Sequence, residues 1–432
     1  PKFLKIFIIS SNKQTMHIIL KAKHLTLYSM ILFFLVGCDK EEPTPNPTPT
    51  EPTPIFEKVW STRIYEAPLE NVGSDNAYIY KDLYLVTGDH WSHPDPSIFA
   101  YNCKTGLLEW KWTQTGRLQF PGYYVIGKEN LLILYTSKGL ICFDIDAKQM
   151  VWEIVFEDEG MVGGNGPVIF GDEVFYVAHL YSRGGPAIYF RANLKTGSHE
   201  RIYQVDIDGG WTPSLSPAAF WINPISSDTL LLTINGKSMS GHGPETSPTD
   251  LLAINLRTKQ LEWKMDSIME VRTNLLTPPV IFENSVIFGG DWSIYSVDIP
   301  SSTVNWRTQF TDLMKVGNFN RTGLLLHDGR VYANPDVFGV MCLDAKNGDV
   351  IWHNKKIAAT CSPNMLYNDD MLITSSWGQG SVFIIDAFTG EVIHKERSEH
   401  DYNIDVLYDS ETDMYFVQDF AEAVGFKINK PK

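Results

Sequence analysis

The stretch CLDAKNGDVIW (residues 342–352) carries the pattern that decides the fold, because it recurs along the chain. Counted from its first residue, Asp344 is third, Gly348 seventh and Trp352 eleventh. The other copies are AYNCKTGLLEW (100–110), CFDIDAKQMVW (142–152), RANLKTGSHER (191–201), AINLRTKQLEW (253–263), SVDIPSSTVNW (296–306) and IDAFTGEVIH (385–394). The third position is always Asp or Asn, and the eleventh is Trp in five of the seven copies. Successive copies lie roughly 40 to 60 residues apart, the period of a propeller blade.

Each motif position has a structural explanation. An Asp or Asn side chain can accept hydrogen bonds from backbone N–H groups two residues on, so we expect an Asx turn. Gly at the seventh position suits a left-handed turn residue. Burying a Trp on the following strand removes about 150–250 Å² from water, so these side chains are expected to dock neighbouring blades. The predicted docking residues are Trp60, Trp110, Trp152, Trp263, Trp306 and Trp352. Arg201 and His394 stand at the same position and are interpreted as structural variants, because both side chains can stack.

Strand-like runs rich in β-branched and aromatic residues flank each motif, and two more precede it, which gives eight sets of four strands. The last set is short of an outer strand, because the chain ends soon after AVGFKI (423–428). FEKVWSTRI (56–64) supplies one from the other end, with Trp60 at the eleventh position. Pairing the two ends completes the eighth blade and closes the ring. The sequence therefore predicts an all-β, eight-bladed propeller of four-stranded antiparallel blades over residues 55–432, with the architecture of WD40 and YVTN propellers. A seven-bladed ring is the alternative.

The composition excludes some classes of partner. Charged residues make up 20% of the chain and hydrophobic residues 44%, as in ordinary globular proteins, and the formal net charge is −15. Nucleic-acid affinity depends on Lys and Arg neutralising phosphates, so a chain with this charge and no basic run in the propeller is not expected to bind nucleic acid. The same argument disfavours direct adhesion to anionic lipid.

The first 54 residues differ from the rest. An apolar run, LTLYSMILFFLVG, follows two lysines and is too short for a spanning helix, so residues 1–37 are interpreted as a signal peptide with upstream residues. The run ends in LVGC, which resembles the lipobox of bacterial lipoproteins and implies lipidation of Cys38. The Pro/Thr-rich segment that completes residues 38–54 is expected to form an extended tether. Lys40, Glu41 and Glu42 resemble the export signal of surface lipoproteins in Bacteroidetes, and the alternative is a solvated charge cluster.

The remaining cysteines do not suggest a metal or catalytic site. Cys142 and Cys342 occupy the first motif position, Cys103 falls in a turn, and Cys361 lies between blades. Their spacing is unlike that of zinc ligands, so we expect buried small side chains and no metal.

Loops between the second and third strands of a blade emerge on the same face as the links between blades, and three of them are long (89–97, 179–187 and 236–250). Loops on a rigid scaffold often carry function, and Trp and Tyr favour interfaces. The candidate ligand or partner contacts on this rim are His90, Trp91, His93, His179, Tyr181, His242, Trp292 and Trp377. The alternative is that these are polar loops whose aromatic residues cover the ends of the blades.

The recurring A-x-D-x-x-T-G-x-x-x-W pattern resembles the tryptophan-docking motif of pyrroloquinoline quinone (PQQ)-like repeats, over about residues 56–432. Two kinds of protein share that repeat. The quinoprotein alcohol dehydrogenases bind PQQ and Ca²⁺, and many place a disulfide between adjacent cysteines against the cofactor. This chain has no adjacent Cys pair and no C-x-x-C-H haem segment, so neither PQQ nor calcium is expected. BamB-type outer-membrane lipoproteins are the other kind, and this chain is similar to them in lipobox, tether, repeat and number of blades.

The sequence therefore predicts a non-enzymatic, lipid-anchored propeller that acts as a protein-interaction scaffold at the bacterial outer membrane, facing the periplasm or the cell surface. Its expected partner is an outer-membrane or envelope protein. The first alternative is a surface lipoprotein that binds glycans, with Trp91, Trp292 and Trp377 as stacking residues. The second is a quinoprotein-type dehydrogenase that has lost or altered its cofactor site.

Overall fold

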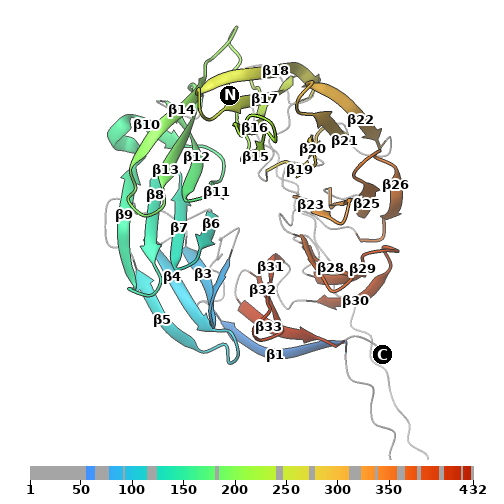
Figure 1. Cartoon of the computed structure of the whole chain (residues 1–432). Helices are drawn as coiled ribbons and strands as arrows, with labels where there is room; N and C mark the ends of the chain where they lie inside the picture. Colours follow the sequence, from blue (N-terminus) through green and yellow to red (C-terminus); the bar gives the residue numbers. More distant parts are fainter. Residues whose placement is uncertain are drawn as a thin grey trace, which may run out of the picture. The chain divides into compact units, whose positions relative to one another are not determined.

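The structure, a computed structural model, describes residues 55–63, 77–90, 93–113, 124–180, 184–239, 247–271, 278–310, 323–335, 339–357, 365–376, 381–397, 403–419 and 422–429. These residues belong to one compact unit, Thr53–Lys432. Its strands form eight antiparallel sheets arranged as the blades of a ring, which confirms the predicted eight-bladed propeller over the seven-bladed alternative (Figure 1). The predicted signal peptide, Cys38 and the tether lie outside the described ranges.

Seven blades are each built from consecutive strands, the first strand innermost and the last outermost (Figure 1). Blade 1 contains β2 (Tyr78–Tyr80), β3 (Leu83–His90), β4 (His93–Asn102) and β5 (Leu108–Thr113), and blade 2 contains β6 (Tyr124–Lys128), β7 (Leu131–Thr136), β8 (Gly139–Asp144) and β9 (Gln149–Val155). Blade 3 follows the 3-10 helix η1 (Phe156–Glu159) and contains β10 (Met161–Gly163), β11 (Val168–Phe170), β12 (Glu173–Leu180), β13 (Ala187–Asn193) and β14 (His199–Val205). Blade 4 contains β15 (Ala219–Ile222), β16 (Thr229–Gly236), β17 (Thr249–Asn255) and β18 (Gln260–Met269).

The same order continues through the second half of the ring. Blade 5 contains β19 (Val280–Phe282), β20 (Ser285–Gly289), β21 (Ser293–Asp298) and β22 (Thr303–Gln309), and blade 6 contains β23 (Leu324–His327), β24 (Arg330–Ala333), β25 (Val340–Asp344) and β26 (Val350–Asn354). Blade 7 contains β27 (Met365–Asn368), β28 (Met371–Ser376), β29 (Ser381–Asp386) and β30 (Val392–Arg397).

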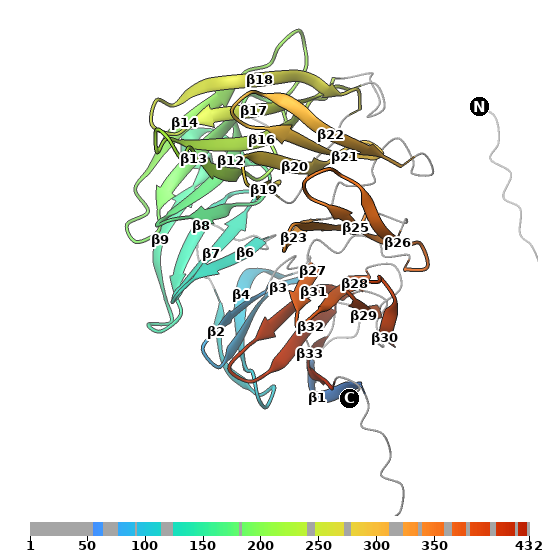
Figure 2. The ribbon, with the colours of Figure 1, turned by 45° about the vertical axis from the view of Figure 1, so that its right-hand side comes forward.

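Blade 8 is assembled from both ends of the chain. Its strands are β31 (Asn403–Asp409), β32 (Met414–Asp419), β33 (Glu422–Ile428) and, on the outside, β1 (Phe56–Arg63). Trp60 pairs with Gly425, and β1 lies beside β33 in both ribbon views (Figures 1 and 2). The predicted closure of the ring is therefore observed.

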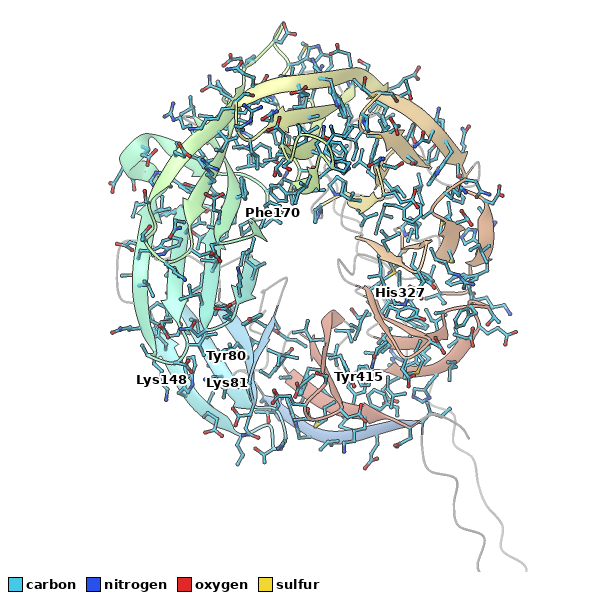
Figure 3. All side chains as sticks on the ribbon, viewed as in Figure 1. Tyr80, Lys81, Lys148, Phe170, His327 and Tyr415 are labelled. Atoms are coloured by element: carbon cyan, nitrogen blue, oxygen red, sulfur yellow. The ribbon has the colours of Figure 1, made fainter. Side chains whose placement is uncertain are left out.

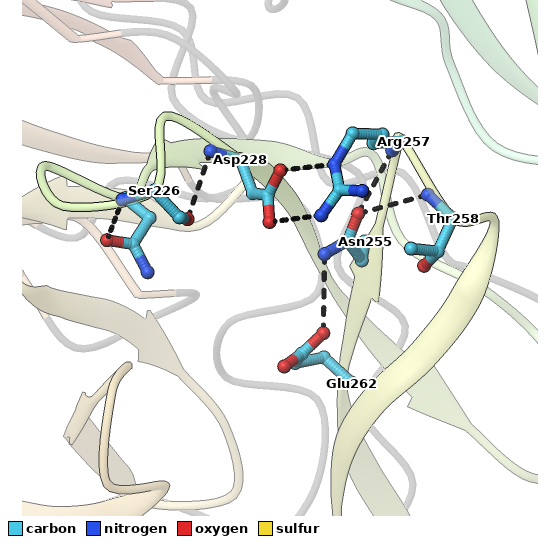
Figure 4. A network of polar contacts seen from close by, with 7 residues as sticks. Ser226, Asp228, Asn255, Arg257, Thr258 and Glu262 are labelled. Carbon is cyan, nitrogen blue, oxygen red and sulfur yellow. Dashed lines mark hydrogen bonds and ion pairs between the residues drawn. The ribbon is translucent and has the colours of Figure 1, made fainter.

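The motif forms the expected turn between the third and fourth strands. In blade 1 the Asn102 side chain accepts hydrogen bonds from the N–H groups of Lys104 and Thr105, at 3.0 and 3.1 Å. Asn255 makes the same turn in blade 4, where Arg257 also forms two hydrogen bonds to Asp228 (Figure 4). The N–H of the fourth motif residue then donates to the hairpin between the first two strands of its own blade; Ala345, for example, donates to the Gly329 carbonyl at 2.8 Å. The turn is thus fixed to its own sheet.

The carbonyl of the same fourth residue also accepts a hydrogen bond from the docking Trp of the preceding blade. Four docking indoles donate their Nε1–H to its carbonyl, at 2.7 to 3.2 Å: Trp60 to Cys103, Trp152 to Leu194, Trp306 to Ala345 and Trp352 to Ala387. Each of these Trp side chains is at most 9% exposed. The indoles lie so close to the seventh motif residue that a Cβ added there would be 2.5 or 2.6 Å from the ring. That residue is Gly106, Gly197, Gly348 or Gly390, all with positive φ. Glycine is therefore required at these joints both by the left-handed backbone and by the space that the indole occupies.

Blade 3 departs from the expected motif geometry. In other blades, such as blade 6, the outer strand bulges just before the docking residue, so that Trp352 pairs with Cys342. In blade 3 the bulge falls at Ile202 instead, and Arg201 pairs with Phe190. Arg201 is exposed and its guanidinium lies over the Phe190 ring at 5.9 Å, whereas Ile202 is buried. Arg201 is therefore not a substitute for the docking Trp. His394, in contrast, stacks on Phe56 of blade 8, with ring centroids 5.7 Å apart.

Cys103, Cys142 and Cys342 are free and buried, and burial raises the pKa of each thiol to about 12. They therefore act as small apolar side chains. Cys361 lies outside the described residues. Across the described part of the chain, no helix has the length and apolar character needed to cross a bilayer.

Candidate functional site

The structure places only part of the predicted rim. Trp91, Tyr181, His242 and Trp377 lie outside the described residues. The backbones of His90 and His93 pair with each other where β3 meets β4, so these two positions do come together. Their side chains are not among those described.

The two other predicted contacts are packed into the fold. His179 is 6% exposed, and a Cβ added at Gly164 would lie 3.2 Å from its Nε2. Trp292 is half-buried and packs against the apolar cluster that joins blades 4, 5 and 6. Both side chains therefore contribute to packing in this structure.

A hollow of about 270 Å³ lies instead between blades 3 and 4, at the ends of their strands. Its walls come from β14, from the link between the two blades, and from β16, β17 and β18. Among the lining residues are Tyr203, Asp206, Asp208, Trp211, Asn235, Lys237, Asp250, Leu252 and Lys264. We refer to this site as the interblade hollow. Lys237 and Asp250 belong to the long loop 236–250, and the other lining residues were not singled out from the sequence.

The link between the blades forms a small hairpin at the hollow. The N–H of Trp211 donates to the Asp208 carbonyl at 2.8 Å, and the N–H of Asp208 donates back to the Trp211 carbonyl at 3.2 Å. Gly209 and Gly210 between them have φ of 56° and 86°. Two positive φ values in a two-residue loop are typical of a type I′ turn, which Gly-Gly favours. The sequence Asp-Gly-Gly-Trp was the signal that could have revealed this hairpin.

A buried carboxylate organises the opposite wall. Asp250 lies at a β-bulge between β17 and β18, and its side chain has no exposed surface. Its Oδ1 accepts a hydrogen bond from the Ser267 N–H at 2.9 Å. Its Oδ2 lies 2.7 Å from the Lys237 Nζ and 3.3 Å from the Lys264 Nζ. Because an unpaired buried charge is costly, this arrangement holds both ammonium groups at the hollow.

Lys264 is held as a cation rather than as a base. Burial alone would lower the pKa of Lys264, but its hydrogen bond to Asp266 and its attraction to Asp250 and Asp266 raise the pKa above its usual value. The Lys264 hydrogen bond in turn lowers the pKa of Asp266. Burial raises the pKa of Tyr203, which keeps its hydroxyl protonated. The hollow therefore offers hydrogen-bond donors and acceptors, and its lysine is not poised for nucleophilic attack or proton abstraction.

The innermost strands carry aromatic and apolar side chains. Phe170 on β11 and His327 on β23 lie toward the inside of the ring, and His327 stacks on Tyr367 with ring centroids 3.6 Å apart (Figure 3). Tyr415 lies on β32, the second strand of blade 8, and is buried against Tyr408 and Phe426. Within the described ranges, no three His, Cys, Asp or Glu side chains gather in a way that could hold a metal ion.

The comparisons with known proteins follow the fold. The family model for outer membrane protein assembly factor BamB matches residues 290–415, from the end of blade 5's second strand to the start of β32. An uncharacterized protein of Rickettsia conorii is 26% identical over 117 residues, a match that spans 25% of this chain and 28% of that protein. The C-terminal blades therefore carry the recognisable family signal.

Solved structures match over most of the chain. BamB from Moraxella catarrhalis matches with a TM-score of 0.56 at 12% identity, over 86% of this chain and all of that one. A europium-containing methanol dehydrogenase matches with a TM-score of 0.62 at 10% identity, over 86% of this chain and 93% of that one. The designed protein Ika8 matches with a TM-score of 0.61 at 12% identity, over 86% of this chain and all of that one. The resemblance to PQQ-like repeat propellers is confirmed, and at these identities the structural matches show the fold alone.

Proposed function

We propose that this PQQ-like repeat propeller is a non-enzymatic, lipid-anchored scaffold at the bacterial outer membrane that binds an envelope protein, as its BamB-type family match suggests. The same fold also occurs in a methanol dehydrogenase, so the fold cannot decide between binding and catalysis. The described residues support binding, because exposed apolar side chains recur on the outer strands. We propose no cofactor, since the chain has no adjacent Cys pair and no C-x-x-C-H segment.

The observation that carries the scaffold proposal is on the outer strands. Each outer strand stands at the end of its sheet. Aliphatic side chains that are 36% to 49% exposed recur there, one or two residues before the docking position: Val59, Leu108, Met150, Val151, Leu261, Val304, Val350, Ile351 and Val392. An exposed edge with apolar side chains can pair with a strand of another protein. The ring therefore offers several equivalent edges to a protein partner.

The test is capture of a partner from detergent-solubilised envelope, with identification by mass spectrometry. Val304→Lys combined with Ile351→Lys places charges on two neighbouring edges and should reduce the captured amount severalfold. Glu283→Lys, on the exposed turn between β19 and β20, makes the same change in net charge away from the outer strands and should leave capture unchanged. Recovery of no protein, together with clear retention on a polysaccharide column, would favour glycan binding over the scaffold role.

A further inference from the structure

We propose that the interblade hollow is a binding site for one ring of a neutral saccharide, with Trp211 as its aromatic wall. This goes beyond the scaffold role and does not depend on it. The outer strands β14 and β18 contribute to the walls, but the groups that carry the inference, Trp211, Asp208 and Asp250, lie on the link between the blades and on β17. The site also differs from the rim positions at which glycan stacking was expected from the sequence.

The size of the hollow limits the ligand. Pockets for drug-sized molecules usually span about 300 to 1,000 Å³. At about 270 Å³, the interblade hollow suits a ligand segment of one ring. A longer saccharide could continue past the exposed side chains of Asp206 and Asp208 at its edge.

The charges of the lining favour a neutral ligand. Two lysines (Lys237 and Lys264) face three aspartates (Asp206, Asp208 and Asp250), which leaves a formal charge of −1. Asp250 pairs with both ammonium groups and Asp266 pairs with that of Lys264, so an anion would meet lysines that are engaged and carboxylates that repel it. A cation would in turn lie close to two ammonium groups. A polyol avoids both costs, because its hydroxyl groups donate to carboxylates and accept from ammonium groups.

The hydrogen-bonding groups match that ligand. An ammonium has three donors, and Lys264 directs its Nζ at Asp250 and Asp266, at 3.3 and 2.5 Å, which leaves one for a hydroxyl. Asp208 is exposed and supplies acceptors beside the indole. Leu252 and Tyr203 add apolar and aromatic surface next to Trp211, against which the C–H face of a sugar ring can pack.

The walls are fixed before a ligand arrives. The Gly-Gly turn sets the spacing of Asp208 and Trp211, and the Thr212 N–H donates to the Ser238 carbonyl at 2.8 Å, which ties the link to blade 4. The bulge and the Ser267 hydrogen bond orient Asp250 and, through it, the lysines. A site built on such rigid elements loses little conformational entropy on binding.

The experiment measures binding of maltotriose, mannotriose and triacetylchitotriose to the purified protein by calorimetry, with trigalacturonate as the charged comparator. The indole N–H signal of Trp211, identified in the ¹H–¹⁵N spectrum by its loss in Trp211→Phe, should shift with at least one neutral trisaccharide. Trp211→Ala should weaken that binding by about tenfold or more, as expected for a central aromatic contact. Phe388→Ala, which removes an exposed aromatic residue from blade 7, is the matched control and should bind normally.

A second variant distinguishes loss of the binding site from unfolding of the protein. Asp208→Asn keeps the hairpin backbone and should weaken the same ligand while the thermal melt stays unchanged. The proposal is overturned if none of the three neutral sugars shifts the Trp211 signal at millimolar concentration. It is also overturned if trigalacturonate binds more tightly than they do, or if a folded Trp211→Ala or Asp208→Asn protein binds as the original does.

Discussion

Two neighbouring joints between blades pack the docking Trp in different ways. Between blades 5 and 6, the Trp306 indole lies over Gly348 and is 9% exposed. Between blades 4 and 5, the corresponding Trp263 faces a motif with Ser302 at the seventh position, and Trp263 is only half-buried. Ser302 still has a positive φ of 50°, so both turns have the same hand. The difference between them is the side chain at the seventh position, and a missing Cβ is what lets the indole lie flat on the turn.

The same division holds around the ring. A glycine at the seventh position goes with a buried Trp on the preceding blade in four joints: Trp60 with Gly106, Trp152 with Gly197, Trp306 with Gly348, and Trp352 with Gly390. Lys148 and Ser302 at that position go with the half-buried Trp110 and Trp263, and Lys259 follows the blade whose docking position holds the exposed Arg201. The seventh position of one motif and the eleventh position of the preceding blade's motif therefore act as a pair across the blade boundary.

A joint without glycine adds polar contacts to its apolar packing. Between blades 1 and 2, the Lys148 Nζ lies 5.7 Å from the Trp110 ring. Nearby, Asp146 accepts a hydrogen bond from the Tyr80 hydroxyl at 2.7 Å and lies 2.9 Å from the Lys81 Nζ. Exposed ion pairs contribute little individually and weaken in salt. Joints of this kind should therefore respond to pH and salt, whereas glycine joints should respond to steric changes.

The largest expected effect comes from Gly348→Ala. The left-handed backbone costs an alanine about 1–2 kcal/mol, and a Cβ placed 2.5 Å from Trp306 adds an overpacking cost of about 1–3 kcal/mol. Gly171→Ala is the matched control, because Gly171 has a positive φ of 61° and nothing within 4 Å of its Cβ position. Urea unfolding should show a loss of stability at least twice as large for Gly348→Ala. Equal losses would mean that the contact with the indole contributes nothing.

Trp306→Phe should have the next largest effect. It removes the N–H that donates to the buried Ala345 carbonyl at 3.2 Å, and such an orphaned acceptor costs about 1–3 kcal/mol. Trp263→Phe changes a half-buried side chain and should cost less than half as much. Thermal melts followed by circular dichroism provide the measurement. A larger loss for Trp263→Phe would contradict the division between the two kinds of joint.

A smaller effect is expected at the residue two places after the docking Trp. The Thr308 hydroxyl donates to the Gly348 carbonyl at 2.5 Å, as the Thr62 hydroxyl does to the Gly106 carbonyl at 2.6 Å. Thr308→Val keeps the shape of the side chain and should cost about 1 kcal/mol, the usual net contribution of one hydrogen bond. Thr308→Ser keeps the hydroxyl and should recover most of that stability in the same urea titration.

The smallest effect should come from Asp146→Asn in the polar joint. Hydrogen bonds from Lys81 and Tyr80 lower the pKa of Asp146 in the folded protein, so its contribution to stability is present above the ordinary Asp pKa and is lost as the pH falls through the lowered value. Melting temperatures at low salt should therefore differ slightly near neutral pH and converge in acid. A difference that persists in acid would show that the side chain acts through packing and not through charge.

Much of this ring could be read from the sequence because its signals are local. An Asx turn and a left-handed glycine lie within five residues of each other, and their repetition at Asp344 and Gly348, or Asn102 and Gly106, sets blade number and register. Arg201 was misplaced because a bulge can shift by one residue without changing the motif letters. The interblade hollow was missed because Trp211 and Asp250 are distant in sequence and meet only once two blades pack together. Repeats reveal what is common to the blades, whereas a site arises where one link differs from the others.

The closure between β1 and β33 has a consequence for how the ring forms. Ser61 and Glu422, joined by a hydrogen bond of 2.8 Å, are 361 residues apart in the chain. Contacts between such distant residues are slow to form, because the entropy of a very long loop is lost before the pairing compensates for it. During synthesis, β31 to β33 emerge after the other strands of the ring, and β1 must wait for them as an unpaired strand. A chaperone that shields Phe56–Arg63 until β33 has emerged would therefore prevent mispairing with another copy of the chain.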